Sequence, residues 1–139
     1  MLRKTVIMMT LLTTLLLSTC IVSATELNED TDQGDMRYKF IERVSVGLSI
    51  KGGTAKVTTD AKDVDGDTTS MSCTVTLQKK SGDSWKKVSG WSKSTQSNVL
   101  SLSKTKAVSK GKYRVKSVVK AYKGSNHETV IKYSGTVAY

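Results

Sequence analysis

Apolar and polar side chains alternate along most of the chain from residue 44 onward, and this is the period of a β-strand that buries one face. The segment SMSCTVTLQK (70–79) shows the pattern most clearly, because Met71, Cys73, Val75 and Leu77 alternate with Ser, Thr and Gln. Glycine-containing turns separate it from its neighbours. The alternation predicts seven strands, at 44–50, 54–59, 70–79, 84–93, 98–103, 112–123 and 129–139.

Seven short strands without a long helical period favour an all-β fold, an antiparallel immunoglobulin-like β-sandwich of about seven strands that spans residues 37–139. Residues 37–45 could add one helical turn or an extra edge strand. Gly90 is expected to mark a bulge that shifts the alternation within the strand 84–93.

The last two predicted strands form a hairpin whose register depends on the length of its loop. A three-residue loop (124–126) places Val119 opposite Ile131 and keeps the apolar residues of both strands on one face. A two- or four-residue loop would put Tyr133 beside Lys116 and mix the faces. We therefore expect the three-residue loop.

The first 24 residues have the layout of a signal peptide helix. Two basic residues precede an uncharged, mostly apolar stretch that is short for a bilayer span, and a Val-Ser-Ala sequence ends the segment. We expect cleavage after Ala24 and therefore secretion. An uncleaved membrane anchor is one alternative, and a lipoprotein modified at Cys20 is another, although Thr19 fits the lipoprotein pattern poorly.

Charge is distributed unevenly along the chain. Of 22 Lys and Arg residues only two precede residue 36, whereas five of the 12 Asp and Glu residues lie in TELNEDTDQGD (25–35). Because this stretch is acidic and has one aliphatic residue, residues 25–36 are predicted to be a disordered lead-in. The remainder is strongly basic, which favours anionic partners such as wall polymers, acidic lipid or extracellular nucleic acid.

Cys73 is the only cysteine that remains after cleavage, so the domain is expected to lack an internal disulfide. Its position in the alternating strand predicts a small buried residue rather than a reactive thiol. His127 is the only histidine, and it follows a turn with no nucleophile at a recognised spacing. The sequence carries no hydrolase, metalloprotease or phosphate-loop motif, and we expect a protein without catalytic activity.

Two segments, CTVTLQKKSGDSWKKVSGWSKS (73–94) and KGKYRVKSVVKAYKG (110–124), resemble bacterial extracellular immunoglobulin-like domains. The order LQK, W, W, YRV and YS over residues 44–139 also resembles small secreted single-domain proteins of Gram-positive Firmicutes, a domain of unknown function. The resemblance implies no catalytic residue. It implies a tyrosine corner at Tyr113. It also implies that five residues belong to the core: Val75, Leu77, Trp85, Tyr113 and Val115.

Four aspartates precede the clearest strand: Asp60, Asp63, Asp65 and Asp67. An EF-hand loop that starts at Asp63 is excluded, because Thr68 replaces the required glycine and Thr74 the required glutamate. Asp65-Gly66 favours a simple turn. The alternative is a looser calcium site formed by the four carboxylates, and no other cofactor is expected.

A basic face is the candidate anion-binding site. Alternation along 112–123 puts several cations and one aromatic ring on the solvent side, and the expected register adds a lysine of the next strand. These residues are Arg114, Lys116, Lys120, Tyr122 and Lys132. A solvated lysine-rich surface that prevents edge pairing is the alternative. Arginine is scarce, which argues against sequence-specific recognition of nucleic acid.

Trp91 is a second candidate, because an aromatic ring beside a glycine could serve as a sugar-binding platform, while Trp85 is expected in the core. The sequence thus predicts a secreted, monomeric, non-catalytic binding module for anionic wall polymers, surface polymers or glycans. It would be held near the cell wall, with membrane contact only through an uncleaved signal segment. A carbohydrate-binding module and a secreted toxin-like effector are the alternatives.

Overall fold

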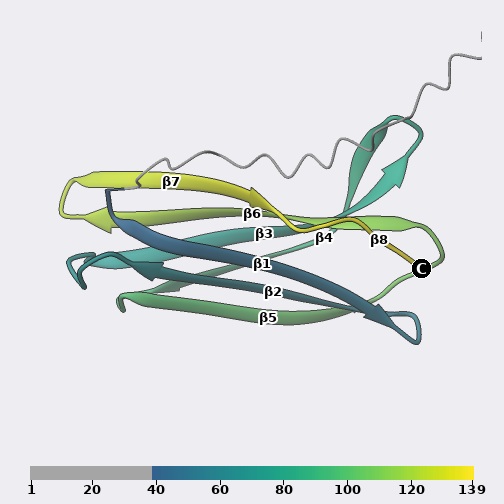
Figure 1. Ribbon diagram of the computed structural model, residues 1–139, viewed down its shortest axis with the longest axis horizontal. Coiled ribbons are helices and arrows are strands. Elements are labelled where there is room, and N and C mark those ends of the chain that lie inside the picture. The colour runs from purple at the N-terminus through teal and green to yellow at the C-terminus, as the bar shows by residue number, and fades with distance from the viewer. Residues whose placement is uncertain (1–38) are drawn as a thin grey trace, which may run out of the picture. The chain divides into compact units, whose positions relative to one another are not determined.

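The computed structural model describes residues 39–139, and these residues form two antiparallel β-sheets packed face to face (Figure 1). The strands are β1 (Ile41–Lys51), β2 (Thr54–Asp63), β3 (Ser70–Ser81), β4 (Ser84–Thr95), β5 (Val99–Ala107), β6 (Lys112–Lys123), β7 (Asn126–Tyr133) and β8 (Val137–Ala138). No helix long and apolar enough to cross a membrane occurs within this range. The predicted signal peptide (1–24) and acidic lead-in (25–36) lie outside the described residues and stay predictions.

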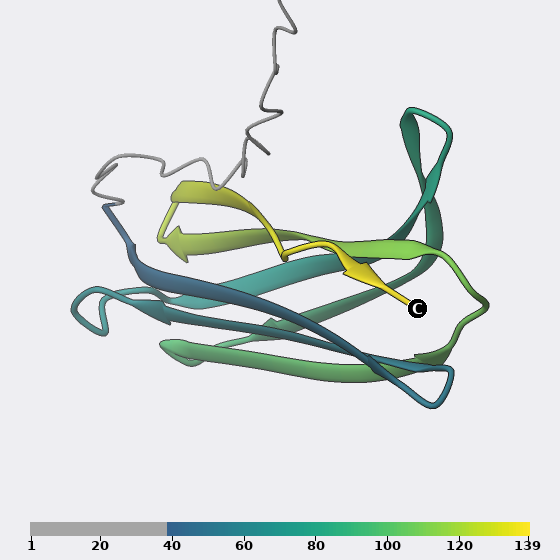
Figure 2. The same cartoon turned by 45° about the vertical axis from the view of Figure 1, so that its right-hand side comes forward.

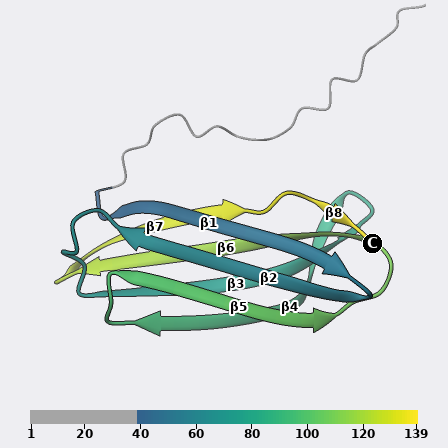
Figure 3. The same cartoon turned by 60° about the horizontal axis from the view of Figure 1, so that its bottom comes forward.

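The smaller sheet has the order β1-β2-β5 and the larger sheet the order β4-β3-β6-β7, with β8 paired to the start of β6. Figure 3 shows the two layers from the side of the smaller sheet. This arrangement confirms the predicted antiparallel immunoglobulin-like sandwich. The edge-strand alternative for residues 37–45 is correct from Ile41 onward, because these residues begin β1.

The predicted strand 129–139 is divided into two short strands. Ser134 causes the break, because its side-chain oxygen accepts a hydrogen bond of 2.8 Å from the Val115 N–H. The Ser134 N–H in turn donates to the Val115 carbonyl at 2.9 Å. The chain therefore leaves the ladder after Tyr133 and returns to β6 as β8.

The core lies between the two sheets and contains the inward-facing residue of almost every second strand position. Each fully buried Val, Leu or Ile side chain contributes about 1.5–3 kcal/mol relative to exposure. The buried apolar residues are Ile41, Val44, Ala55, Val57, Ala61, Met71, Cys73, Val75, Leu77, Leu100, Leu102, Tyr113, Val115, Val119, Ala121 and Val130. Four of the five core residues implied by the resemblance are among them, and Trp85 is not.

Tyr113 forms the expected tyrosine corner where the chain crosses from the smaller sheet to the larger. Its ring is buried, and its hydroxyl donates a hydrogen bond of 2.8 Å to the Ser109 carbonyl, four residues upstream. Lys79 packs over the ring and over Gly111, where an added Cβ would lie 2.5 Å from the Lys79 Cε. The φ of +154° at Gly111 is what favours glycine there, because the Lys79 side chain could move away from a Cβ.

Two lysines on the outer strands of the larger sheet connect it to the smaller one. The Lys93 ammonium on β4 donates to the Ser101 carbonyl on β5 at 2.6 Å. The Lys132 ammonium on β7 donates to the Val44 carbonyl on β1 at 2.9 Å. Each open side of the sandwich is thus bridged by a hydrogen bond from a charged group.

Glu128 on β7 fixes the start of the described chain. Its carboxylate accepts hydrogen bonds from three successive backbone N–H groups, those of Lys39, Phe40 and Ile41, at 2.9, 2.9 and 3.0 Å. Such charge-assisted bonds are stronger than neutral ones. They anchor the entry into β1 against the larger sheet.

The β6–β7 hairpin differs from the expected register, and the three-residue loop is wrong. The loop has two residues, Gly124 and Ser125, and the φ of +60° at Gly124 suits such a tight turn. Val119 pairs with Val130, which is buried and takes the inward position that was expected for Ile131. Ile131 and Tyr133 therefore face outward, and their side chains are 48% and 45% exposed.

A bulge in β4 separates the two tryptophans. Gln78 pairs with Lys87 and Leu77 with Ser89, so Val88 is the extra residue, two positions before the expected site. Trp85 and Trp91 are six residues apart and would share a face without the bulge; with it they lie on opposite faces. The β3–β4 hairpin bends away from the smaller sheet at this end (Figures 1 and 2).

The Tyr113→Phe substitution tests the tyrosine corner. It removes the hydroxyl that donates to the Ser109 carbonyl, so we expect a loss of about 1 kcal/mol in the free energy of unfolding. Urea unfolding followed by circular dichroism measures it. Tyr133→Phe on the outer face is the control, with an expected change below about 0.5 kcal/mol. Equal effects of the two substitutions would contradict the role of Tyr113.

A substitution at Thr59 is expected to stabilise the fold rather than destabilise it. Its side chain is fully buried, and its hydroxyl has no hydrogen-bond partner within residues 39–139. Thr59→Val replaces that hydroxyl by a methyl group, so we expect stability to rise by about 1 kcal/mol. Thr105→Val on the exposed edge strand is the matched control. Destabilisation by Thr59→Val would show that the hydroxyl is satisfied in solution.

Candidate functional site

The outward side of the larger sheet is basic, and we call it the basic face. Residues of β6 that alternate with the buried ones point to solvent on this side, and the register aligns outward positions of β3, β4 and β7 with them. Its cations are Lys80, Lys87, Lys112, Arg114, Lys116 and Lys120. None of the outward positions on β3, β4, β6 and β7 carries an aspartate or glutamate.

Four of the five predicted anion-binding residues lie on the basic face, and Lys132 does not. Lys132 pairs with the buried Ser117, so it belongs to the inward side and bonds the Val44 carbonyl across the sandwich. This correction follows directly from the two-residue turn. Tyr122 lies at the end of the basic face away from Arg114, with the His127 ring 5.9 Å away between centroids.

Arg114 stands at the centre of a cluster that the alternation alone did not predict. Its guanidinium carbon lies 4.3 Å from the centroid of the Trp85 ring and 4.5 Å from that of the Tyr133 ring. Its Nε donates a hydrogen bond of 2.9 Å to the Gln78 side chain. Contacts of this kind combine cation–π attraction with stacking of planar groups.

Trp85 and Tyr133 were both expected to face the core. The bulge at Val88 turns Trp85 outward, and the two-residue β6–β7 turn does the same for Tyr133. The Lys80 ammonium also lies 5.2 Å from the centroid of the Trp85 ring. A sequence signal existed for Trp85, because any one-residue bulge between the two tryptophans, including the one expected at Gly90, puts them on opposite faces.

Trp91, the predicted sugar platform, faces the other way. It pairs with the buried Val75 and packs, partly buried, against the core. Its ring is therefore not part of the basic face. Within the larger sheet, Trp85 is the tryptophan on the outward side.

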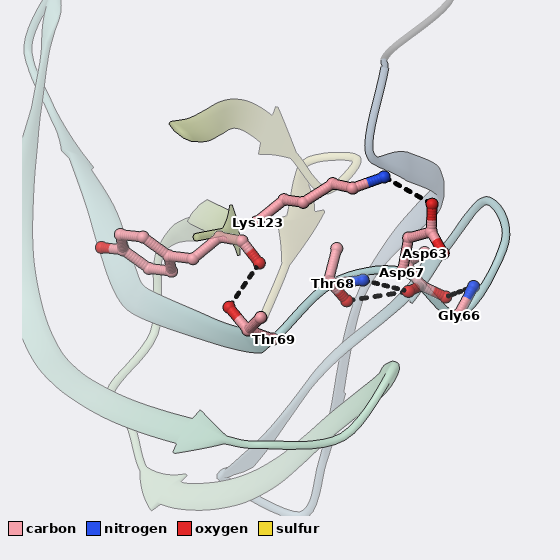
Figure 4. A network of polar contacts seen from close by, with 7 residues as sticks. Asp63, Gly66, Asp67, Thr68, Thr69 and Lys123 are labelled. Atoms are coloured by element: carbon pink, nitrogen blue, oxygen red, sulfur yellow. Dashed lines mark hydrogen bonds and ion pairs between the residues drawn. The ribbon is translucent and has the colours of Figure 1, made fainter. Parts of the chain in front are cut away.

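The aspartate loop is a turn organised by Asp63, as Figure 4 shows. The Asp63 carboxylate is buried and accepts bonds of 3.0 Å from the Gly66 N–H, 3.0 Å from the Thr68 N–H and 2.8 Å from the Thr68 hydroxyl. Burial by itself would raise the pKa of Asp63. The hydrogen bonds from Thr68 and Gly66, together with the nearby Lys62 charge, outweigh burial and lower the pKa.

The four aspartates do not converge. Asp60 accepts a hydrogen bond from the Ser101 hydroxyl on β5, and Asp67 forms an ion pair with Lys123. In residues 39–139 no three His, Cys, Asp or Glu side chains are grouped so that they could hold a metal ion. The arrangement supports the turn rather than a shared calcium site formed by Asp60, Asp63, Asp65 and Asp67.

Cys73 lies in the core, as the alternation predicted. It is 2% exposed, and burial raises the pKa of its thiol, so the thiol stays protonated at neutral pH. A protonated thiol enclosed between two sheets is a poor nucleophile.

No protein-family model and no curated protein sequence matches the chain. Among solved structures, the crystal structure of wild-type OgpA from Akkermansia muciniphila has 17% sequence identity and a TM-score of 0.47. The match covers 73% of this chain and 30% of that one. Catalytically inactive OgpA with an O-glycopeptide (glycodrosocin) substrate has 14% identity and a TM-score of 0.43, with the same coverage. The chain spans about 30% of the length of OgpA, and similarity at this level assigns it no activity.

Asp63→Asn tests the turn through its pH dependence. A carboxyl whose pKa is lowered on folding stabilises the fold above its unfolded pKa of about 3.9, and this contribution is lost as pH falls through the folded pKa. We expect the variant to be less stable at pH 7 by about 1–3 kcal/mol. The difference should shrink below about pH 4.

Urea titrations from neutral to acidic pH, followed by tryptophan fluorescence, measure this difference. Asp65→Asn is the matched control, because Asp65 is exposed in the same loop. A difference between Asp63→Asn and the native protein that stays constant with pH would refute the role of the Asp63 charge.

Proposed function

We propose that the protein is a secreted, non-catalytic binding module that associates with anionic polymers of the cell wall or cell surface through the basic face. One observation carries the proposal: the outward positions of one sheet face include six lysine and arginine residues and no acidic residue. Charges of one sign on one face concentrate a polyanion and speed its association.

The shape of the basic face suits an extended ligand. Its cations on β6 run from Lys112 to Lys120, a distance of about 27 Å at roughly 3.4 Å per residue. The neighbouring outward positions of β3 carry hydroxyl groups, on Ser72, Thr74 and Thr76, which can donate and accept hydrogen bonds. Lysines act as point charges here, so the attraction does not require one fixed ligand geometry.

The outward side of the smaller sheet carries acidic as well as basic residues, unlike the basic face. Lys62 pairs with Glu42 at 2.9 Å, and Asp60 lies in the same sheet two residues before Lys62. Positive charge on that side is therefore partly neutralised. This contrast favours the basic face of the larger sheet as the attachment site.

The predicted signal peptide supports the extracellular part of the proposal. The predicted signal peptide would carry the domain out of the cell, where anionic polymers of the envelope are abundant. A folded part with many more basic than acidic residues then remains near such polymers by electrostatic attraction.

Reversing two charges on the basic face tests the proposal. The double variant Lys116→Glu, Lys120→Glu should bind immobilised polyphosphate and purified Gram-positive cell walls at least about tenfold more weakly at low salt. Retention of the native protein should fall steeply as salt increases, because exposed charges are screened. Column elution over a salt gradient measures both effects.

The matched control is Lys56→Glu, an exposed position on the outward side of the smaller sheet. It changes the net charge in the same direction but leaves the basic face intact, so it should shift elution only slightly. Salt-insensitive retention, or a single Lys56→Glu change as damaging as the double variant, would overturn the proposal.

A further inference from the structure

Arg114 is held by residues from three different strands. Gln78 on β3 accepts a hydrogen bond from its Nε, Trp85 reaches it from β4, and Tyr133 reaches it from β7. Since β3 and β4 lie on one side of β6 and β7 on the other, the two rings approach from opposite sides. The guanidinium is thereby fixed, and a ligand that binds it need not restrict a mobile side chain.

The Arg114 charge has no carboxylate partner in the described part of the chain. The ion pairs there join Lys62 with Glu42 and Lys123 with Asp67. Gln78 occupies the Nε, so the terminal nitrogens are left to meet a ligand. A planar guanidinium matches a carboxylate with two parallel hydrogen bonds, which a lysine ammonium cannot do.

The rings beside Arg114 narrow the ligand chemistry further. Tyr133 is 45% exposed and Trp85 is partly exposed, so both present apolar surface next to the fixed charge. Such rings combine an apolar face with a polar tip, and the apolar C–H face of a sugar ring can pack on them. A ligand recognised only through phosphate groups would need lysines but would gain nothing from the two rings.

We infer that Trp85, Arg114 and Tyr133 form a subsite for a carboxylate-bearing sugar of an acidic polysaccharide. The carboxylate bonds the Arg114 guanidinium, the sugar ring packs on an aromatic ring, and the adjoining anionic residues of the polymer follow Lys116 and Lys120 along β6. This inference rests on the proposed function and names the ligand class of the same face.

The test uses tetragalacturonate as the probe, with cellotetraose as the neutral counterpart and tetrapolyphosphate as an anion without sugar. In a Trp91→Phe background Trp85 is the only tryptophan, so its fluorescence reports binding at the subsite. We expect a saturable change with tetragalacturonate and at least about tenfold weaker binding of the other two probes. Circular dichroism checks that the background variant is folded.

Arg114→Lys separates the fixed guanidinium from mere charge. It should weaken tetragalacturonate binding at least about tenfold, because the charge is kept and the two parallel hydrogen bonds to the carboxylate are lost. Tyr133→Ala, on the exposed side of the sheet, should weaken tetragalacturonate selectively as well. Lys56→Gln is the control with an equivalent surface position away from the basic face.

Two results would overturn the inference. One is tetragalacturonate binding that Arg114→Lys and Tyr133→Ala leave unchanged, and the other is binding of tetrapolyphosphate as tight as that of tetragalacturonate. If the native protein still shows salt-dependent retention through Lys116 and Lys120, only the subsite is wrong. If polyphosphate and cell walls do not retain the native protein at all, the proposed function itself is wrong.

Discussion

Burial of every second strand residue between the two sheets is the constraint on which the rest of the structure depends. Within residues 39–139 no disulfide shares this role, because the one cysteine there, Cys73, is itself a core side chain. Stability therefore rests on apolar burial, on the Tyr113 corner, and on the lysine bridges at the two open sides. The same constraint decides which residues are left outside, and so it also defines the surface available to a ligand.

The basic face follows from that division. Inward positions of β6 are apolar or small, and its outward positions hold Arg114, Lys116 and Lys120. Lysine on a sheet surface also prevents strands of different molecules from pairing, which would explain part of the charge without a ligand. Arg114 is different, because three neighbouring strands supply partners that orient it. Preventing aggregation requires charge but no such orientation, and this distinction sets Arg114 apart from the surrounding lysines.

Sequence patterning predicted the sandwich, seven strands and most of the core, because these depend on averages over many alternating positions. It failed where a shift of one residue decides which face of the sheet a side chain takes. Adjacent apolar pairs occur in the last hairpin, Val118-Val119 and Val130-Ile131, so either register buries a valine or isoleucine. In β4 the extra residue Val88 likewise decides which face of the sheet Trp85 takes. Sequence patterning therefore predicted the lysines of the candidate site but not its two aromatic rings. The outward positions of Trp85 and Tyr133 both depend on such single-residue shifts.

The Val88 bulge has a consequence for how this surface can change during evolution. Loss of one residue at that point would restore regular pairing and carry Trp85 from the outer side of the sheet to the inner side, while the strands themselves stay in place. A single codon deletion could thus erase an aromatic binding element without dismantling the scaffold, and a single insertion could create one. Relatives with the same strand order could accordingly differ in their ligands through the length of this one hairpin.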